Sequence, residues 1–200
     1  ATFSVTASGS SPFNYQWYKK NLTPSLSTIG TGTDLNTATT YPSPYGNWFW
    51  GARQQFFYKA TDVIAAGGSA GIINSMAFNV QTPKGTYLKG YTIKIGTTPS
   101  DSISNNIFID GLQTIYTADS IVDVSGWNTY SFSSPYYWDG SSNLLVEISF
   151  NNTSYTQNAV VYQTNTSYAS SLCVFADISG VSSMTTGTKY YQRPNIKLGF

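Results

Sequence analysis

The sequence GWNTYSFSSPYYWDGSSNLLVEISF, residues 126–150, decides the fold class of this chain. In its last part, apolar side chains occupy every second position, at Leu144, Val146, Ile148 and Phe150. A period of two is the pattern of a β-strand that has one face in a core. Residues 127–132 alternate in the same way, and Asp139-Gly140 between the two segments is typical of a turn. The stretch therefore predicts two β-strands around a turn.

Most of the chain repeats this design at the short, regular spacing of an antiparallel β-sandwich. Strands of this kind close into two packed sheets most readily as a jelly roll or a related sandwich. We expect an all-β, jelly-roll-like domain over residues 41–200. About nine strands are predicted, at residues 54–60, 72–80, 91–96, 112–118, 127–132, 144–150, 159–164, 172–177 and 196–200. One helical turn is predicted at residues 62–66, with Thr61 as its N-cap and Gly67-Gly68 as its end.

Residues 1–20 are predicted to form a separate β-hairpin, and residues 21–40 a polar linker. The larger apolar side chains alternate along the two arms of this hairpin, at Phe3, Val5, Phe13, Tyr15 and Trp17. The run TFSVTASGSSPFNYQWYKKN resembles the second and third strands of bacterial immunoglobulin-like domains, whose Trp packs between the sheets. The other strands of such a domain are missing. Because a lone hairpin is marginal in water, it either docks on the sandwich or is completed by another chain, such as a second copy.

A longer resemblance covers residues 30–200. It is carried by GTGT at 30–33, YP at 41–42, GNW at 46–48, AAG at 65–67, INSMAF at 73–78, YTIKIG at 91–96, GWNT at 126–129, NLLVEI at 143–148 and RPNI at 193–196. In this order and spacing the chain resembles a β-sandwich module of large secreted proteins from bacteria that use type IX secretion. The resemblance implies an extracellular or cell-surface module, often beside immunoglobulin-like repeats, and it brings no catalytic motif.

Two tripeptides fit that setting. The sequence DSI occurs at residues 101–103 and again at 119–121. Both resemble the Asp-Ser/Thr-apolar sequon for O-glycosylation in such bacteria. The resemblance makes Ser102 and Ser120 candidate modification sites, and plain loop or strand-edge serines are the alternative.

Composition argues against several function classes. Charged residues are 10% of the chain, against about 25% in an average globular protein. The net charge is +1 and no basic run occurs, so nucleic-acid binding is not expected. No apolar run approaches the ~20 residues of a membrane span, so we expect no membrane insertion.

Catalytic chemistry is also poorly served. Without histidine there is no Ser-His-Asp triad and no His-ligated zinc, and the single Cys173, in an apolar run, is expected to be a buried inert thiol. The nine acids suit turns, a helix start or strand faces, so no glycosidase pair and no enzyme are expected. No metal or cofactor is expected. Structural Ca²⁺ at Asn105-Asn106 with Asp110, or at Asp119 with Asp123, is weighed against solvated turn acids.

Aromatic residues are 16% of the chain, and they suggest sugar binding, because sugar rings stack on flat exposed aromatics beside amide donors. Two aromatic loops supply the candidate platform residues Tyr41, Tyr45, Trp48, Trp50, Tyr136, Tyr137 and Trp138. They form one platform only if both loops lie at the same end of the sandwich. The alternative is that these side chains plug the ends of the sandwich.

The sequence therefore predicts a structural or adhesive module of a bacterial surface protein or filament, joined through its N-terminal hairpin. Its partners would be copies of itself, a polysaccharide or another cell surface. The alternative function is a carbohydrate-binding module that uses the aromatic loops, and an enzyme comes third.

Overall fold

The computed structural model describes residues 4, 6, 8–10, 12 and 25–200, and this part of the chain holds thirteen strands and two short helices. They are β1 (Leu26–Ile29), β2 (Asp34–Leu35), β3 (Gly51–Tyr58), α1 (Ala60–Ala65), β4 (Gly71–Thr82), β5 (Leu88–Thr98), β6 (Gln113–Ile121), β7 (Gly126–Trp138), β8 (Asn143–Asn151), β9 (Val160–Asn165), β10 (Ser171–Ala176), the 3₁₀ helix η1 (Val181–Ser183), β11 (Thr188–Tyr190), β12 (Gln192–Pro194) and β13 (Ile196–Gly199).

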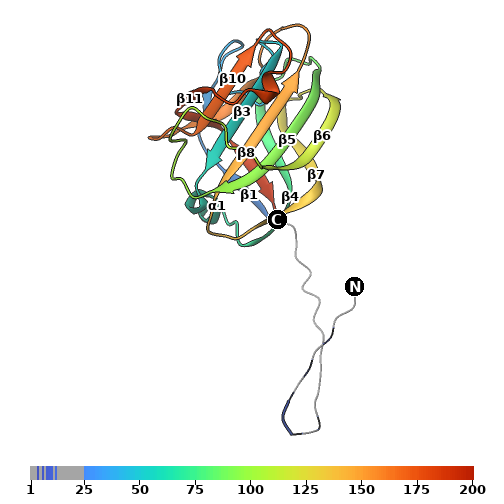
Figure 1. The fold of residues 1–200 in the computed structure, drawn as a ribbon, viewed down its shortest axis with the longest axis vertical. Helices are drawn as coiled ribbons and strands as arrows, with labels where there is room; N and C mark the ends of the chain where they lie inside the picture. Colours follow the sequence, from blue (N-terminus) through green and yellow to red (C-terminus); the bar gives the residue numbers. More distant parts are fainter. Residues whose placement is uncertain (1–3, 5, 7, 11, 13–24) are drawn as a thin grey trace.

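Eight of these strands give two antiparallel sheets a jelly-roll order (Figure 1). In one sheet, β1, β13, β4 and β7 lie side by side, and in the other β3, β8, β5 and β6 do. The chain passes from one sheet to the other between β3 and β4, β4 and β5, β6 and β7, and β7 and β8, as the two Greek keys of a jelly roll require. The predicted all-β, jelly-roll-like sandwich is confirmed.

The two strands of residues 126–150 belong to different sheets. β7 pairs with β4, whereas β8 pairs with β3 and β5. The turn between them is a corner of the sandwich, where Oδ1 of Asp139 accepts the N–H groups of Ser141 and Ser142 at 2.7 Å each. The predicted faces are correct, because the alternating apolar side chains of β8 all lie in the core: Leu144, Val146, Ile148 and Phe150.

Four strands lie where the sequence predicted none, so the strand count is thirteen rather than nine. Two of them, β1 and β2, fall inside the predicted linker, which is therefore wrong from residue 25 onward. β1 pairs with β13 from Leu26 opposite Gly199 to Ile29 opposite Ile196, and Ile29 is buried in the core. Ser27, the other residue of β1 that faces the core, is polar although it is buried. The sequence of β1 therefore lacks the alternation of apolar residues that would predict a strand.

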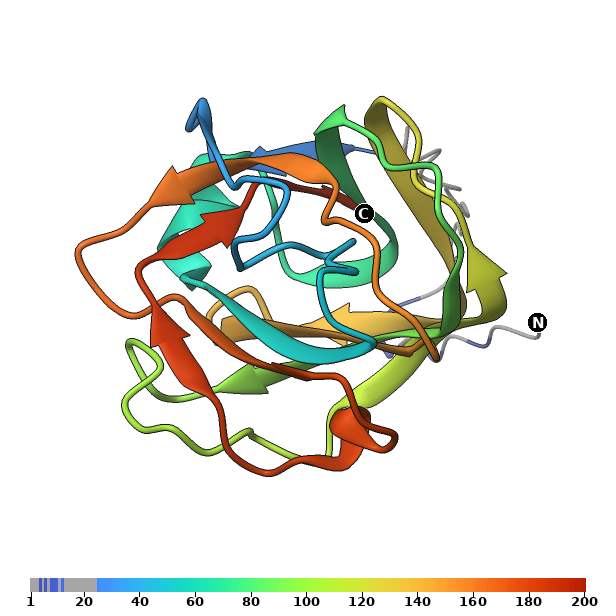
Figure 2. The same cartoon turned by 90° about the horizontal axis from the view of Figure 1, so that it is seen from above.

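The segment before β3 fills one end of the space between the sheets, as Figure 2 shows in a view along the sandwich. Tyr41 stacks on Phe175 with 4.1 Å between the ring centroids. Tyr45 stacks on Tyr91 at 6.1 Å and receives a 3.0 Å hydrogen bond from the hydroxyl of Tyr130. These buried rings belong to the core of the sandwich.

Helix α1 begins two residues earlier than predicted, at Ala60, and its N-cap is Lys59 rather than Thr61. The N–H of Ala60 donates to Oδ1 of Asn143 at 2.8 Å, so a side chain from β8 takes the place of a local cap. The predicted end is correct. Gly67 has φ +89°, and the N–H groups of Gly67 and Gly68 donate back to Ile64 and Val63.

The first and last residues of the described sandwich are neighbours. The N–H of Phe200 donates to the carbonyl of Ser25 at 3.0 Å, so both residues lie at the same end of the sandwich. The predicted hairpin residues lie outside the described residues: Phe3, Val5, Phe13, Tyr15 and Trp17. Among the residues that are described, no helix has the length and apolar character needed to cross a membrane.

Candidate binding surface

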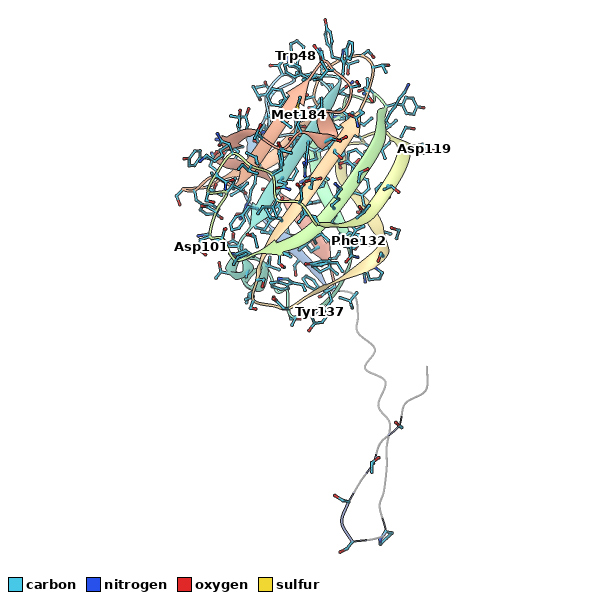
Figure 3. All side chains as sticks on the ribbon, viewed as in Figure 1. Trp48, Asp101, Asp119, Phe132, Tyr137 and Met184 are labelled. Carbon is cyan, nitrogen blue, oxygen red and sulfur yellow. The ribbon has the colours of Figure 1, made fainter. Side chains whose placement is uncertain are left out.

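The structure does not bring the predicted platform residues together. Figure 3 shows Trp48 at one end of the sandwich and Tyr137 at the other. The strand pairing agrees. Tyr137 opposes Ile72 near the start of β4. Trp48 lies two residues before Trp50, whose carbonyl accepts the N–H of Asn152 just after the end of β8 that lies away from the β7–β8 corner. Tyr136, Tyr137 and Trp138 lie in strand β7 and not in a loop.

Burial divides the seven candidates further. Tyr41, Tyr45 and Trp138 are buried in the core, and the indole N–H of Trp138 donates to the carbonyl of Ser142 at 2.8 Å. Trp50 and Tyr136 are half-buried. Only Trp48, 36% exposed, and Tyr137, 65% exposed, present their rings to solvent among the seven. The expected shared platform is therefore absent, and most of these rings fill the sandwich.

A different aromatic group forms at the Trp48 end. The rings of Trp48 and Tyr155 meet edge to face, with centroids 5.9 Å apart and planes at 67°. Tyr155 is 57% exposed and Tyr87, from the loop before β5, is 65% exposed. Sequence reasoning missed Tyr87 and Tyr155, because each is a single tyrosine in a polar loop. The available signal was that the two loops, between β4 and β5 and between β8 and β9, lie at the same end of the sandwich as Trp48.

A shallow groove accompanies these aromatic residues. It consists of two hollows of about 220 and 260 Å³ that share Thr86 and Thr156. Tyr87, Lys89 and Asn152 are among the residues of the first hollow, and Lys84 and Gln157 complete the second. Both volumes lie below the ~300–1,000 Å³ of a pocket that engulfs a small molecule. The shape suits a chain that lies across the surface.

Buried amides hold the groove in place. Asn47, which is buried, donates from Nδ2 to the hydroxyl of Thr156 at 2.9 Å and accepts from Nδ2 of Asn152 at 2.8 Å. Asn152 also donates to the carbonyl of Tyr87 at 2.9 Å and accepts the N–H of Lys89 at 2.8 Å. The three loops at this end are thus connected through two asparagines. A surface fixed in this way loses little conformational entropy when a ligand binds.

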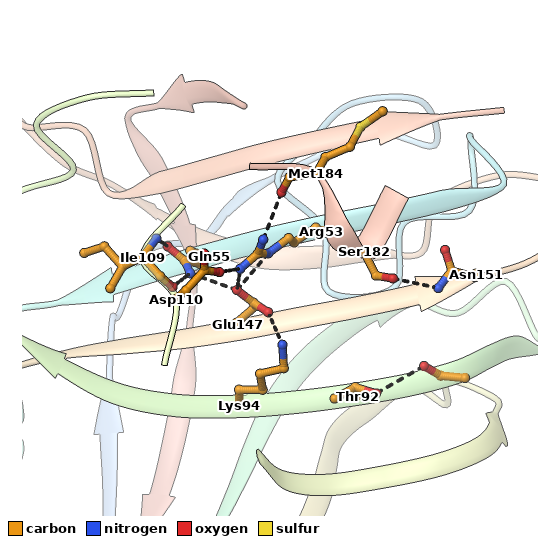
Figure 4. Close-up of polar contacts among 11 residues, drawn as sticks. Arg53, Gln55, Thr92, Lys94, Ile109, Asp110, Glu147, Asn151, Ser182 and Met184 are labelled. Carbon is orange, nitrogen blue, oxygen red and sulfur yellow. Dashed lines mark hydrogen bonds and ion pairs between the residues drawn. The ribbon is translucent and has the colours of Figure 1, made fainter. Parts of the chain in front are cut away.

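The outer face of the second sheet carries a buried ion network (Figure 4). Glu147 lies beneath the segment of residues 99–111 and accepts from Arg53, Gln55 and Lys94 at 2.8–2.9 Å. Arg53 also binds the carbonyl of Met184 and the carboxylate of Asp110. Its guanidinium lowers the pKa of Asp110 from the usual value. Through Asp110 and Met184, the network connects two loops to the sheet, and its charged groups form hydrogen bonds with one another.

A cavity of about 150 Å³ lies beside this network, under residues 98–109. Ser102 is half-buried in its wall, whereas Ser120 is exposed on β6. Both serines remain predicted glycosylation sites. Cys173 is buried, as predicted, and burial raises the pKa of its thiol.

Two of the three acids weighed for calcium, Asp110 and Asp123, have protein partners, whereas Asp119 is exposed on β6. Asp110 pairs with Arg53, and Asn105 accepts the N–H of Ile107. Asp123 is buried and accepts the N–H of Lys84 at 2.8 Å, and burial raises the pKa of its carboxyl. Within the described residues, no three Asp, Glu, His or Cys side chains converge as a metal site would need.

Comparison of the chain with protein-family models, with curated proteins and with solved structures found no match.

Proposed function

We propose that this chain is a non-catalytic adhesive module of an extracellular bacterial surface protein. The resemblance of residues 30–200 to modules of secreted bacterial proteins supports the location. The observation that carries the adhesive role is the position of the exposed aromatic group. Trp48 lies at the end of the sandwich opposite Ser25 and Phe200 (Figures 1 and 3). Tyr155 packs on Trp48, and Tyr87 lines the groove that Asn47 and Ser154 also line, so both belong to the same end.

This arrangement suits display of a binding tip. A module held through Ser25 and Phe200 would present the Trp48 end outward to a surface. The arrangement is less suited to a link that bears mechanical load. Because β1 and β13 are antiparallel neighbours, a force that pulls Ser25 and Phe200 apart would break the hydrogen bonds between the two strands one after another. The geometry thus favours adhesion over a purely mechanical link.

Adhesion of coated beads tests the proposal. Beads that carry the full chain should adhere to bacterial envelopes or to secreted matrix, and beads that carry Trp48→Ala should adhere less. Tyr137→Ala is the control, since it removes an exposed aromatic ring at the opposite end of the sandwich. Failure of the unmodified chain to adhere to any such material would contradict the proposed function.

Self-assembly through residues 1–20 is the second part of the proposal. Within the described residues β1 pairs only with β13, so the other edge of β1 offers backbone donors and acceptors to an added strand. A hairpin from a neighbouring copy would fit such an edge. Removal of residues 1–20 should convert assemblies into monomers on size-exclusion chromatography. Unchanged assembly after this deletion would remove self-association from the account and leave the adhesive tip.

A further inference from the structure

The groove at the Trp48 end differs from the rest of the surface in its charge. Lys84 and Lys89 both line it, and no Asp or Glu does. Neither lysine forms an ion pair with any residue that the structure describes, and the ammonium of Lys84 donates a hydrogen bond to Oε1 of Gln157 in the same groove. The carboxylate of Asp123 accepts the backbone N–H of Lys84, but Asp123 is buried and does not line the groove. The groove therefore presents positive charge, although the whole chain is almost neutral.

Hydroxyls and amides occupy the space between the two lysines. Thr86 and Thr156 form the shared floor of the hollows, with their hydroxyl oxygens 3.3 Å apart. Thr153 adds a further hydroxyl to this lining, whereas the amide of Asn152 is engaged with Asn47, Tyr87 and Lys89. Such groups exchange hydrogen bonds readily with the hydroxyls of a sugar.

The exposed rings supply the apolar contact. Tyr87 lines the groove. Tyr155 lies between the lining residues Ser154 and Thr156, and its ring packs on that of Trp48. The flat faces of sugar rings carry C–H groups that pack on aromatic faces. Aromatic rings, hydroxyls and ammonium groups that have no carboxylate partner among the described residues together match a polymer of sugar rings that bear carboxylates.

We infer that the groove of Lys84, Thr86, Tyr87, Lys89 and Thr156 binds an acidic polysaccharide, with uronate carboxylates at the lysines and sugar rings on Tyr87, Tyr155 and Trp48. This inference rests on the proposed adhesive function and names the chemical class of its target. A single-stranded nucleic acid would also stack on these rings. It is less well matched, because two cations in an almost neutral chain neutralise few phosphates.

Affinity electrophoresis through gels that contain polygalacturonate tests the inference. The full chain should be retarded, and the retardation should fall as salt rises, because added ions screen exposed charges within about 10 Å at 0.1 M. Tyr87→Ala and Trp48→Ala should each weaken binding about tenfold. Tyr137→Ala, which removes a ring as exposed as that of Tyr87 at the far end, should leave binding unchanged.

The lysines separate acidic from neutral ligands. Lys84→Gln and Lys89→Gln should each weaken polygalacturonate binding about fivefold, and Lys189→Gln, outside the groove, should not. In gels with neutral dextran the two groove substitutions should have no effect.

Four results would overturn the inference: no retardation by polygalacturonate, equal loss in Tyr137→Ala, stronger retardation by neutral dextran, or stronger retardation by single-stranded DNA. If coated beads still adhered to envelopes, such a result would leave the adhesive function standing. If adhesion also failed, both proposals would fall.

Discussion

Arg53 on β3 donates two hydrogen bonds to one carboxylate oxygen of Glu147 on the neighbouring strand β8, from Nε at 2.9 Å and from Nη2 at 2.8 Å. Both side chains are almost fully buried, at 5% and 1% exposure. They lie on the face of the sheet that points away from the sandwich core, under the segment of residues 99–111. The pair therefore connects the sheet to the loops that cover it.

Loss of Glu147 should be costly. Glu147→Ala leaves the guanidinium of Arg53 and the ammonium of Lys94 without their shared carboxylate, and removing one partner of a buried ion pair costs about 3–5 kcal/mol. Asp110→Ala is the matched control, because that carboxylate also binds Arg53 but is 74% exposed, and its loss should cost much less than the loss of Glu147. Urea unfolding measures both. Equal losses in the two variants would contradict a buried network.

The two tryptophans of the predicted sugar platform should behave in opposite ways. Trp138→Ala removes a fully buried indole from the core and should lower the free energy of unfolding by about 3–5 kcal/mol. Trp48→Ala removes a partly exposed ring and should cost about 1 kcal/mol. Thermal unfolding monitored by circular dichroism distinguishes them. A stable, fully folded Trp138→Ala protein would show that the ring is not part of the core.

Strand β1 supplies a third test, since its residues were expected to form a linker. Ile29→Ala should destabilise the sandwich by about 2–5 kcal/mol, because Ile29 is buried against the core. Leu26→Ala, three residues earlier on the same strand, should change stability by about 0.5 kcal/mol or less, because that side chain is 65% exposed. Chemical denaturation gives both values. An Ile29→Ala variant with unchanged stability would contradict the placement of this segment in the sandwich and would support a linker.

The corner between β7 and β8 predicts a pH effect. Hydrogen bonds from Ser141 and Ser142 lower the pKa of Asp139 to about 2, below the ~3.9 of an unfolded chain. The stabilisation is therefore complete above about pH 4 and is lost as the pH falls toward 2. Asp139→Asn lacks this titration, so the difference in melting temperature between it and the unmodified protein should shrink over that interval. A difference that stays constant from pH 5 to pH 2 would contradict the assignment.

Much of the fold could be predicted because alternation is strong where one strand face is apolar. All nine predicted strands exist, and the core face of β8 is correct. The pairing of β7 and β8 could not be read from the turn, since a hairpin and a corner between sheets use the same Asp-Gly chemistry. β1, β2, β11 and β12 are two to four residues long, and so short a segment carries too few side chains to show a period.

The binding surface was harder to predict than the fold. Aromatic density drew attention to Tyr41, Tyr45 and Trp138, yet these rings are buried, because sequence density does not separate core from surface. Tyr155 meets Trp48, and Tyr87 lies in the adjoining groove, only through the topology, in which the β4–β5 and β8–β9 connections lie at the same end. Contacts that depend on sheet order are not encoded in any single stretch.

The orientation of the immobilised protein tests the central claim most directly. Cys173 is buried with a raised thiol pKa, so a new exposed cysteine would be the reactive thiol of the described sandwich. Ser154→Cys couples the protein to a bead through the groove, and Tyr137→Cys couples it through the opposite end. The adhesive account predicts that beads coupled through Tyr137→Cys adhere to polygalacturonate and bacterial envelopes, whereas beads coupled through Ser154→Cys do not. Equal adhesion in the two orientations, or adhesion only through the Ser154→Cys coupling, would contradict it.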